Sequence, residues 1–373
     1  MKLAFCLSYF FPYGGQQRDF LKIAEICQRR GHSIQVLVMD VAGEFPAGFE
    51  VTQIAGRGYS NHRRFLDFSR KAQALLAKSN FAAVVGFTKM PGLDVYYAAD
   101  TCYREKVFAT RSALYRLTDR FRVYEALERA VFGPDSNAEI LLIAEAEKEK
   151  FIRHYATPVE RFHSLPPGIA RDRIAPANAS EIRQELRAEL GLAEDDLMLL
   201  MIGSAFKTKG LDRAMTALAS LSPGLRKRCR FYIVGQDRQS PFLRLSRKLG
   251  IDSQVRFMGG RGDVPRFLLG ADLLLHPAYL ENTGTVLVEA IAAGLPVLAT
   301  SACGYAGHVE QAGAGLLIPA PFSQQTMNDL LARMLVAPER PTWRHNALAY
   351  AAAADIYNLH EKAADIIESV ARR

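Results

Sequence analysis

The feature that most constrains the fold is an order of segments that occurs once in each half of the chain. Residues 3–10 form an apolar run of strand length, a glycine-containing turn follows, residues 16–30 keep helical spacing, and 33–40 has the pattern of a second strand. The same order returns from a strand at 197–202 through a glycine turn and a helix to a strand at 230–237. A strand, turn, helix and strand in this order is a βαβ unit. The chain therefore contains the starts of two α/β domains.

Further apolar runs of strand length alternate with helical segments, which predicts parallel sheets. The length of 373 residues also suits two domains rather than one. The predicted fold is therefore α/β, with two Rossmann-like domains that face a cleft. These further strands are expected at 83–87, 140–144, 255–259, 272–276 and 296–299.

A domain boundary is predicted at "LPPGIARDR" (165–173), where two prolines and a glycine interrupt the pattern. The expected domains are 1–166 and 167–355. Periodicity does not decide whether the last helical segment, 356–373, stays with the second domain or joins the first.

The composition narrows the class of protein and the compartment. It is 49% hydrophobic and 23% charged, typical of a folded chain, and its five cysteines are scattered without a CxxC pair, which favours a reducing cytoplasm. The apolar N-terminus lacks the cleavage site of a signal peptide and fits a buried strand. Gly294 and Pro296 interrupt the longest charge-free stretch, which is therefore a poor transmembrane span. A net charge of +8 favours anionic partners such as nucleic acid, acidic lipid headgroups or phosphorylated sugars.

Glycine turns follow several predicted strands, where helix N-termini direct unpaired N–H groups at anions. No G-x-G-x-x-G opens the first helix and no G-x-x-x-x-G-K-[ST] is present, which argues against a dehydrogenase and a P-loop enzyme. Lys207 and Lys209 precede Gly210 and are either solvated residues or phosphate ligands. A cation at a helix N-terminus opposes the helix dipole unless an anion binds there, which favours the role of phosphate ligand. Because no D-x-D pair follows a strand, we expect neither a metal nor a cofactor.

Two carboxylates, Glu281 and Glu289, stand eight positions apart in "ENTGTVLVEAIAAGLPV". Either one alone is best explained as a charge that favours the N-terminal end of a helix. Eight residues at helical rise span about 12 Å, comparable to the reach from a ribose across a diphosphate to a hexose.

Several stretches together identify a family: "FPYGGQQRDFLKIAEICQRRGHSIQVL", "KTKGLDRAM", "VRFMGG" and "PAYLENTGTVLVEAIAAGLPVLAT". The chain resembles the retaining nucleotide-sugar glycosyltransferases of the two-Rossmann-domain (GT-B) type with an E-x7-E signature. Within that family, "VVGFTKMPGLDVYYAAD" and "DLLLHPAY" resemble enzymes that add glucose to the first inner-core heptose of lipopolysaccharide. The resemblance implies transfer of a hexose, with retention, from UDP-glucose or an N-acetylhexosamine analogue.

The resemblance also implies that the domain 1–166 binds the acceptor and the domain 167–355 binds the nucleotide-sugar donor, and it implies roles for individual residues. Glu289 holds the ribose hydroxyls, Glu281 contacts the transferred sugar, and the base lies near Phe257 and Met258. Lys209 and Glu281 carry the chemistry, while Asp19 and Asp100, expected in first-domain turns, either contact the acceptor or act as caps or solvated carboxylates. The diphosphate is met by Gly14 and Gly15 of the first domain, by Arg173, Lys207 and Lys209, and by the segment Asn282, Thr283, Gly284, Thr285, Val286 and Leu287.

The sequence departs from the family in two places. Ser204 stands where an arginine usually follows the glycine of the second-domain turn, and the usual first-domain histidine loop reads "GFTKMPG" (86–92). Lys207 or Arg173 is expected to supply the missing positive charge.

Residues 103–122 form a basic segment with interleaved aromatic residues. It is a solvated helix face, an interface with acidic lipid headgroups or a nucleic-acid surface. The resemblance favours the lipid, because such enzymes act at the inner face of the cytoplasmic membrane on a lipid-anchored, phosphorylated heptose-core acceptor. The expected membrane or acceptor contacts are Arg104, Lys106, Arg111, Arg116, Arg120 and Arg122.

Two alternatives remain at this point. A nucleic-acid-binding Rossmann protein fits the positive charge but leaves Glu281 and Glu289 without a role, so we expect no nucleic-acid partner. An epimerase that acts on the same nucleotide sugars fits the fold equally well.

Overall fold

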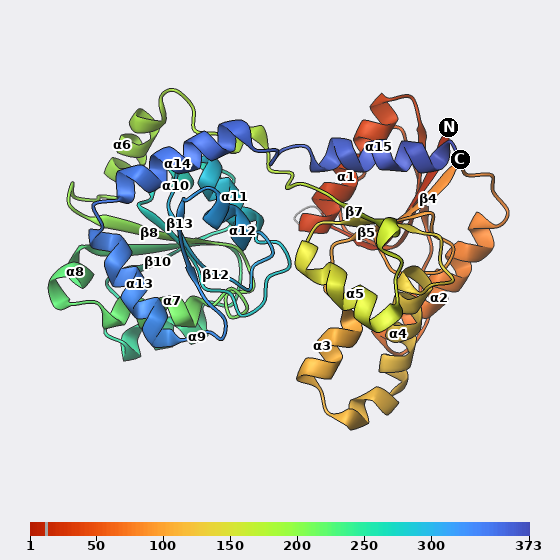
Figure 1. The fold of residues 1–373 in the computed structure, drawn as a ribbon, viewed down its shortest axis with the longest axis horizontal. Helices are drawn as coiled ribbons and strands as arrows, with labels where there is room; N and C mark the ends of the chain where they lie inside the picture. The colour runs from red at the N-terminus through yellow and green to blue at the C-terminus, as the bar shows by residue number, and fades with distance from the viewer. Residues whose placement is uncertain (12–13) are drawn as a thin grey trace. The chain divides into compact units, whose positions relative to one another are not determined.

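The computed structural model describes residues 1–11 and 14–373, and this part of the chain divides into two compact units. The first unit is Met1–Gly168 together with Asn358–Arg373, and the second is Ile169–Tyr357. Each is a parallel sheet covered by helices on both faces, which confirms the predicted fold class (Figure 1). The acceptor and donor roles assigned to the two units stay predictions.

In its described residues, the first unit has a seven-stranded sheet in the order β3-β2-β1-β4-β5-β6-β7. Helices α1 and α15 cover one face, and α2, α4 and α5 cover the other (Figure 1). The strands are β1 (Lys2–Phe10), β2 (Ser33–Val41), β3 (Phe49–Gln53), β4 (Ala83–Gly86), β5 (Val95–Ala98), β6 (Glu139–Leu142) and β7 (Phe162–Ser164). The helices are α1 (Gly15–Arg29), α2 (Asn61–Leu76), α3 (Tyr103–Thr110), α4 (Asp119–Phe132), α5 (Lys148–Tyr155) and α15 (Leu359–Ala371).

The described second unit has a six-stranded sheet in the order β10-β9-β8-β11-β12-β13. Helices α6, α10, α11 and α14 pack on one face and α7, α9 and α13 on the other. The strands are β8 (Leu197–Ile202), β9 (Cys229–Val234), β10 (Val255–Gly259), β11 (Leu273–His276), β12 (Val297–Thr300) and β13 (Gly315–Ile318). The helices are α6 (Ala179–Glu189), α7 (Leu211–Ser220), α8 (Pro223–Arg228), α9 (Ser240–Lys248), α10 (Val264–Gly270), α11 (Thr285–Ala292), α12 (Ala306–Gln311), α13 (Gln324–Val336) and α14 (Arg340–Ala353).

The last helix, α15, packs on the first unit, which settles what periodicity left open. It lies against α1, and Leu359, Ala363 and Ile367 are buried in the core that the two helices share with the sheet. Burial of one large aliphatic side chain stabilises a fold by roughly 1.5–3 kcal/mol. Arg30, at the end of α1, donates to the carboxylates of Glu361 and Asp365 on α15. Apolar burial and charge pairing therefore hold the C-terminal helix on the first unit.

Candidate functional site

Two loops of the second unit meet at the carboxyl ends of neighbouring strands β8 and β11. The loop after β8 carries Lys209 and ends at Gly210, and the loop after β11 carries Glu281 and ends at Gly284. The Tyr279 amide donates to the Thr208 carbonyl and joins the loops at 2.8 Å. Ligands of such sheets bind where the carboxyl ends of strands meet helix N-termini. These two loops therefore form the candidate site.

Gly210 allows the two loops to approach each other. It is the N-cap of α7, with φ +79°, and a Cβ on it would lie 2.0 Å from the Pro277 carbonyl oxygen. Any other residue would be strained by the backbone angle and would clash with the second loop. The glycine therefore fixes the position of Lys209, its neighbour in sequence.

Lys209, His276 and Glu281 form a compact group, here called the Glu281 cluster. Lys209 Nζ donates to Glu281 Oε2, and His276 Nε2 lies 3.3 Å from the same oxygen. The Glu281 side chain is only 12% exposed. An ion pair with little access to water is less screened than one on the surface. The cluster therefore places one carboxylate and one ammonium together at the end of β11.

His276 was missed by the sequence reasoning, because a histidine at the end of an apolar strand looks like a core residue. It is fully buried, and its burial, followed by the positive charge of Lys209, lowers its pKa to about 3. The ring is therefore neutral near pH 7. A neutral ring with its proton on Nε2 can donate to Glu281 without adding a second positive charge beside Lys209.

Glu281 does not lie in the helix that follows it, so the argument from helical rise was wrong. It forms an isolated parallel bridge with Cys303, and α11 begins only at Thr285, after Gly284 with φ +81°. Of the expected diphosphate donors, the Leu287 amide already donates to the Gly284 carbonyl. Asn282 and Thr283 lie in the same loop, where the Thr283 carbonyl accepts from the Tyr305 amide. Thr285 and Val286 open the helix.

Glu289 lies on α11 and pairs with Arg173. Arg173 Nε donates to Glu289 Oε1 at 3.1 Å, and both side chains are mostly buried. Arg173 therefore orients the Glu289 carboxylate, and the contact of this carboxylate with the ribose stays a prediction. Arg173 lies in a short 3₁₀ turn, Arg171–Arg173, just inside the second unit.

Lys207 and Lys209, which sequence alone could not separate, have different surroundings. Lys207 is 68% exposed and its Nζ donates to Asp212 Oδ2 and to the Tyr279 hydroxyl. Lys207 is thus neutralised at the surface, and its role as a diphosphate ligand beside Lys209 stays a prediction. Ser204 stands where the family usually has an arginine, and its hydroxyl accepts a hydrogen bond from the Gln236 amide.

Phe257 and Met258 lie within β10 rather than after it. Both are half-buried, Phe257 against Phe206 on one face of the sheet and Met258 against the core on the other. Their contact with the base of the donor stays a prediction.

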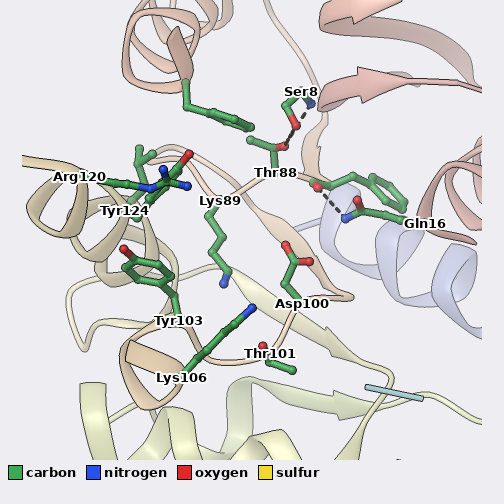
Figure 2. Close-up of a pocket in the computed structure, with 13 residues that line it drawn as sticks. Ser8, Gln16, Thr88, Lys89, Asp100, Thr101, Tyr103, Lys106, Arg120 and Tyr124 are labelled. Carbon is green, nitrogen blue, oxygen red and sulfur yellow. Dashed lines mark hydrogen bonds between the residues drawn. The ribbon is translucent and has the colours of Figure 1, made fainter. Parts of the chain in front are cut away.

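In the first unit, the prediction that Asp19 lies in a turn was wrong. Asp19 belongs to α1, where it accepts from the Tyr97 hydroxyl and contacts His360 Nε2 at 2.8 Å. Asp100 does lie in a loop, between β5 and α3, and is exposed. Asp19 is therefore paired within the first unit and 27% exposed, whereas Asp100 is accessible beside a pocket of the same unit (Figure 2), and an acceptor contact by either stays a prediction.

Gly14 and Gly15 occupy the start of α1. A Cβ on Gly14 would lie 1.8 Å from Gln17 Oε1, whereas Gly15 has open space around it. A side chain at position 14 would thus require the Gln17 side chain to move, and the contact of both glycines with the diphosphate stays a prediction.

The predicted basic segment consists of α3, a 3₁₀ helix (Ala113–Leu117) and the start of α4. Its cations differ in their contacts: Arg104 approaches Glu125 and donates to the His154 carbonyl, and the Arg116 guanidinium lies 3.8 Å from the centre of the Phe108 ring. Arg111 lies over Tyr115, whereas Arg122 is an exposed residue of α4. Leu114 and Leu117 are 75% and 67% exposed at the same tip. The segment therefore presents apolar and cationic side chains together.

Nowhere in residues 1–11 and 14–373 do three or more His, Cys, Asp or Glu side chains gather as a metal site requires. Across the same described ranges, no helix combines the length and apolar character needed to cross a bilayer.

Comparison with known proteins identifies the class. The family model described as "Glycosyl transferases group 1" matches residues 182–350, which include both loops of the candidate site. The chain is also 45% identical over 368 residues to the lipopolysaccharide glucosyltransferase WaaG of Escherichia coli (strain K12), covering 98% of each protein. The chain belongs to the group 1 glycosyltransferases.

Solved structures agree with this assignment. A crystal structure of WaaG superimposes with a TM-score of 0.90 over 98% of this chain and 99% of that one. Anabaena HepE, solved with UDP and glucose, has a TM-score of 0.74 at 20% identity and shows the shared fold alone. The protein is a glycosyltransferase of GT-B fold. These matches favour a transferase over the epimerase.

Proposed function

We propose that the protein transfers a hexose from UDP-glucose, or from an N-acetylhexosamine analogue, to an inner-core heptose of lipopolysaccharide with retention of configuration. The likeness to WaaG over nearly the full length supports this substrate pair. The observation that carries the proposal is the Glu281 cluster beside the N-terminus of α11, with Glu289 farther along the same helix. One carboxylate can bind the ribose, the other can bind the hexose, and the cation can bind the diphosphate between them.

The donor-binding roles follow from the chemistry of each group. Glu289, held by Arg173, accepts hydrogen bonds from the ribose hydroxyls. Glu281, held by the neutral ring of His276, accepts from hydroxyls of the hexose. The amides of Thr285 and Val286 and the ammonium of Lys209 meet the diphosphate. Lys209 pairs with Glu281, so binding of the donor requires this ammonium to share its charge with the incoming phosphate.

The reaction exchanges one bond for another at the anomeric carbon. The bond from that carbon to the phosphate oxygen breaks, the bond to the acceptor oxygen forms on the same face, and the acceptor proton passes to the departing phosphate. Negative charge develops on the diphosphate, where a fixed cation and amide dipoles lower the barrier most. Lys209 therefore stabilises the transition state more than the ground state. The reaction then needs no metal to offset the negative charge on the diphosphate.

The test is a panel of UDP-sugars offered with a deacylated heptose-core saccharide, with and without EDTA. We expect transfer of one hexose, unaffected by the chelator, and a loss of roughly 100-fold or more in kcat for Lys209→Met. The matched control is Lys227→Met, which removes an exposed lysine of α8 in the same unit. Hydrolysis or epimerisation of the UDP-sugar without a glycosylated product would refute the proposed reaction.

We further propose that residues 103–122 bind the anionic inner face of the cytoplasmic membrane. Exposed Leu114 and Leu117 supply apolar contacts, and the neighbouring arginines are attracted by acidic headgroups at about 1 kcal/mol each. Cosedimentation with phosphatidylglycerol vesicles tests this directly. Replacing Leu114 and Leu117 by serine should weaken binding several-fold, and equal binding by the variant would contradict the proposal.

A further inference from the structure

The second unit contains a cavity of about 500 Å³ at the end of its sheet opposite the candidate site. Asp272 and Pro296 line this cavity and directly precede β11 and β12, so it lies at the amino ends of these strands, whereas Glu281 follows β11. Helices α6 and α14, which supply the arginines of the lining, pack on the same face of the sheet (Figure 1). The cavity is therefore separate from the loops proposed to bind the donor.

Asp272 is the only acidic residue of the lining, and its capacity to accept hydrogen bonds is fully used. Its Oδ1 accepts from Arg183 at 2.7 Å and from Arg340 at 2.9 Å. Its Oδ2 accepts from Arg187 at 3.1 Å and from the Met198 amide at 2.7 Å. A carboxylate has about four acceptor sites, and here each of them has a donor. Asp272 therefore holds three guanidinium groups together but has no acceptor site for a fourth.

Arg344 is that fourth arginine, and it has no partner. It lies one helical turn after Arg340 on α14 and lines the same cavity. Its side chain is half-buried, yet its guanidinium forms no hydrogen bond or ion pair among the residues that the structure describes. Burial, followed by the positive charge of Arg183, lowers the pKa of Arg344, while Asp272 acts in the opposite direction. A guanidinium stays charged in proteins, so the donors of Arg344 are left for a ligand.

The charges around the cavity select a multivalent anion. Four guanidinium groups gather around one carboxylate, which leaves an excess of three positive charges. Asp196 does not reduce this excess, because only its carbonyl accepts from Arg187 and its carboxylate lies 3.3 Å from Arg230. Such an excess attracts anions, and the fork of a guanidinium matches two oxygens of a phosphate at once.

The remaining walls recognise neither a sugar nor a base. Apart from its three arginines and Asp272, the lining consists of alanine and proline residues, whose side chains have no hydrogen-bonding group. The volume falls in the range of small-molecule sites, roughly 300–1,000 Å³. The lining therefore suits a small, strongly charged molecule rather than the backbone of a nucleic acid.

We propose that this cavity binds a small phosphate compound with two or more negative charges, such as diphosphate. Arg344 donates to the phosphate without competition from a carboxylate of the protein. Arg340 contributes as well, because only its Nη2 is engaged with Asp272. Arg183 adds positive charge, since its donors are already shared between Asp272 and the carbonyl groups at the end of α10. The site goes beyond the proposed transfer reaction and does not depend on it.

The experiment is a calorimetric titration of the full chain with sodium diphosphate. Two binding events are expected, because Lys209 offers a second cation for diphosphate at the candidate site. Arg344→Gln should weaken one event about tenfold or more, since it removes a charge-assisted contact, and Lys209→Met should weaken only the other. Arg344→Lys keeps the charge without the planar fork and should restore part of the affinity. The matched control, Arg333→Gln, removes an exposed arginine of α13 and should bind as the wild type does.

Urea unfolding of the same variants separates binding from a structural role. Because Arg344 has no partner in the protein, Arg344→Gln should unfold at the same urea concentration as the wild type. If this variant fails to fold, Arg344→Lys provides the same comparison. A binding event that depends on Arg344 but not on Lys209 supports the proposal. Equal diphosphate binding by the wild type and Arg344→Gln overturns it.

A lipid headgroup carries the same phosphate chemistry, so the variants are also tested with phosphatidylglycerol vesicles. The proposal predicts that Arg344→Gln binds vesicles as the wild type does while it binds diphosphate more weakly. The reverse result, with weaker vesicle binding and unchanged diphosphate binding, assigns Arg344 to the lipid and overturns the proposal.

Discussion

The second unit should lose stability in acid because of one buried histidine. His276 is fully buried at the end of β11, and its Nδ1 has no hydrogen-bond partner within the described residues. Its Nε2 faces Glu281, but burial and the positive charge of Lys209 lower its pKa to about 3. The folded protein therefore keeps this ring neutral at pH values where a solvated histidine is charged.

The size of the effect follows from proton linkage. An unfolded histidine takes up a proton below about pH 6.5, whereas the folded His276 does so only near pH 3. Between these values the unfolded state binds one more proton, so the free energy of unfolding falls as the pH decreases. The slope is about 1.4 kcal/mol per pH unit, so at pH 4.5 His276 lowers the stability by roughly 2–3 kcal/mol.

The assay is urea unfolding of the full chain at pH 7.5 and pH 4.5, followed by tryptophan fluorescence. The single tryptophan, Trp343, lies on α14 and packs against the core of the second unit, so its signal reports on that unit. In His276→Gln the loss of stability between the two pH values should be smaller than in the wild type by roughly 2–3 kcal/mol. The control is His345→Gln, an exposed histidine of the same helix as Trp343. An acid loss equal to that of the wild type in His276→Gln would refute the assignment of a neutral, buried ring.

Three other perturbations have defined outcomes. Glu128→Gln leaves a buried lysine without its partner and should reduce the stability of the first unit by about 3–5 kcal/mol, measured by urea unfolding followed by circular dichroism. Gly210→Ala should destabilise the second unit by more than Gly191→Ala, since both glycines have positive φ but only at position 210 would a Cβ meet backbone; equal losses of fluorescence-detected stability would argue against the clash. Arg173→Gln releases the carboxylate of Glu289 and should raise the Kd for UDP about tenfold by calorimetry, and an unchanged Kd would count against this role.

The architecture could be predicted from local pattern, but four of its short strands could not. The strands at 33–40, 83–87 and 255–259 are long or strongly apolar and were found, and the repeated βαβ order indicated both sheets. Four strands were missed: β3, β5, β7 and β13. They have three to five residues, and a run that short does not establish a period, so strands of the same length, such as β4 and β12, were found from their apolar character alone. Their pairing depends on neighbouring strands that lie far away in sequence.

The candidate site was predictable in part for similar reasons. Spacing and resemblance indicated Glu281 and Lys209, and the structure brings both into one ion pair. Pattern alone could not separate Lys207 from Lys209, because the difference depends on Asp212 and Tyr279, which lie elsewhere in the chain. It could not indicate His276 either, since burial of a strand-end histidine against a charged pair is a tertiary contact.

The structure of the protein with UDP-glucose bound tests the central claim most directly. The account predicts that the ribose hydroxyls lie within hydrogen-bond distance of Glu289, the glucose hydroxyls within reach of Glu281, and the diphosphate against Lys209 and the first amides of α11. A nucleotide bound elsewhere in the second unit, or a glucose with neither carboxylate near it, would contradict the account.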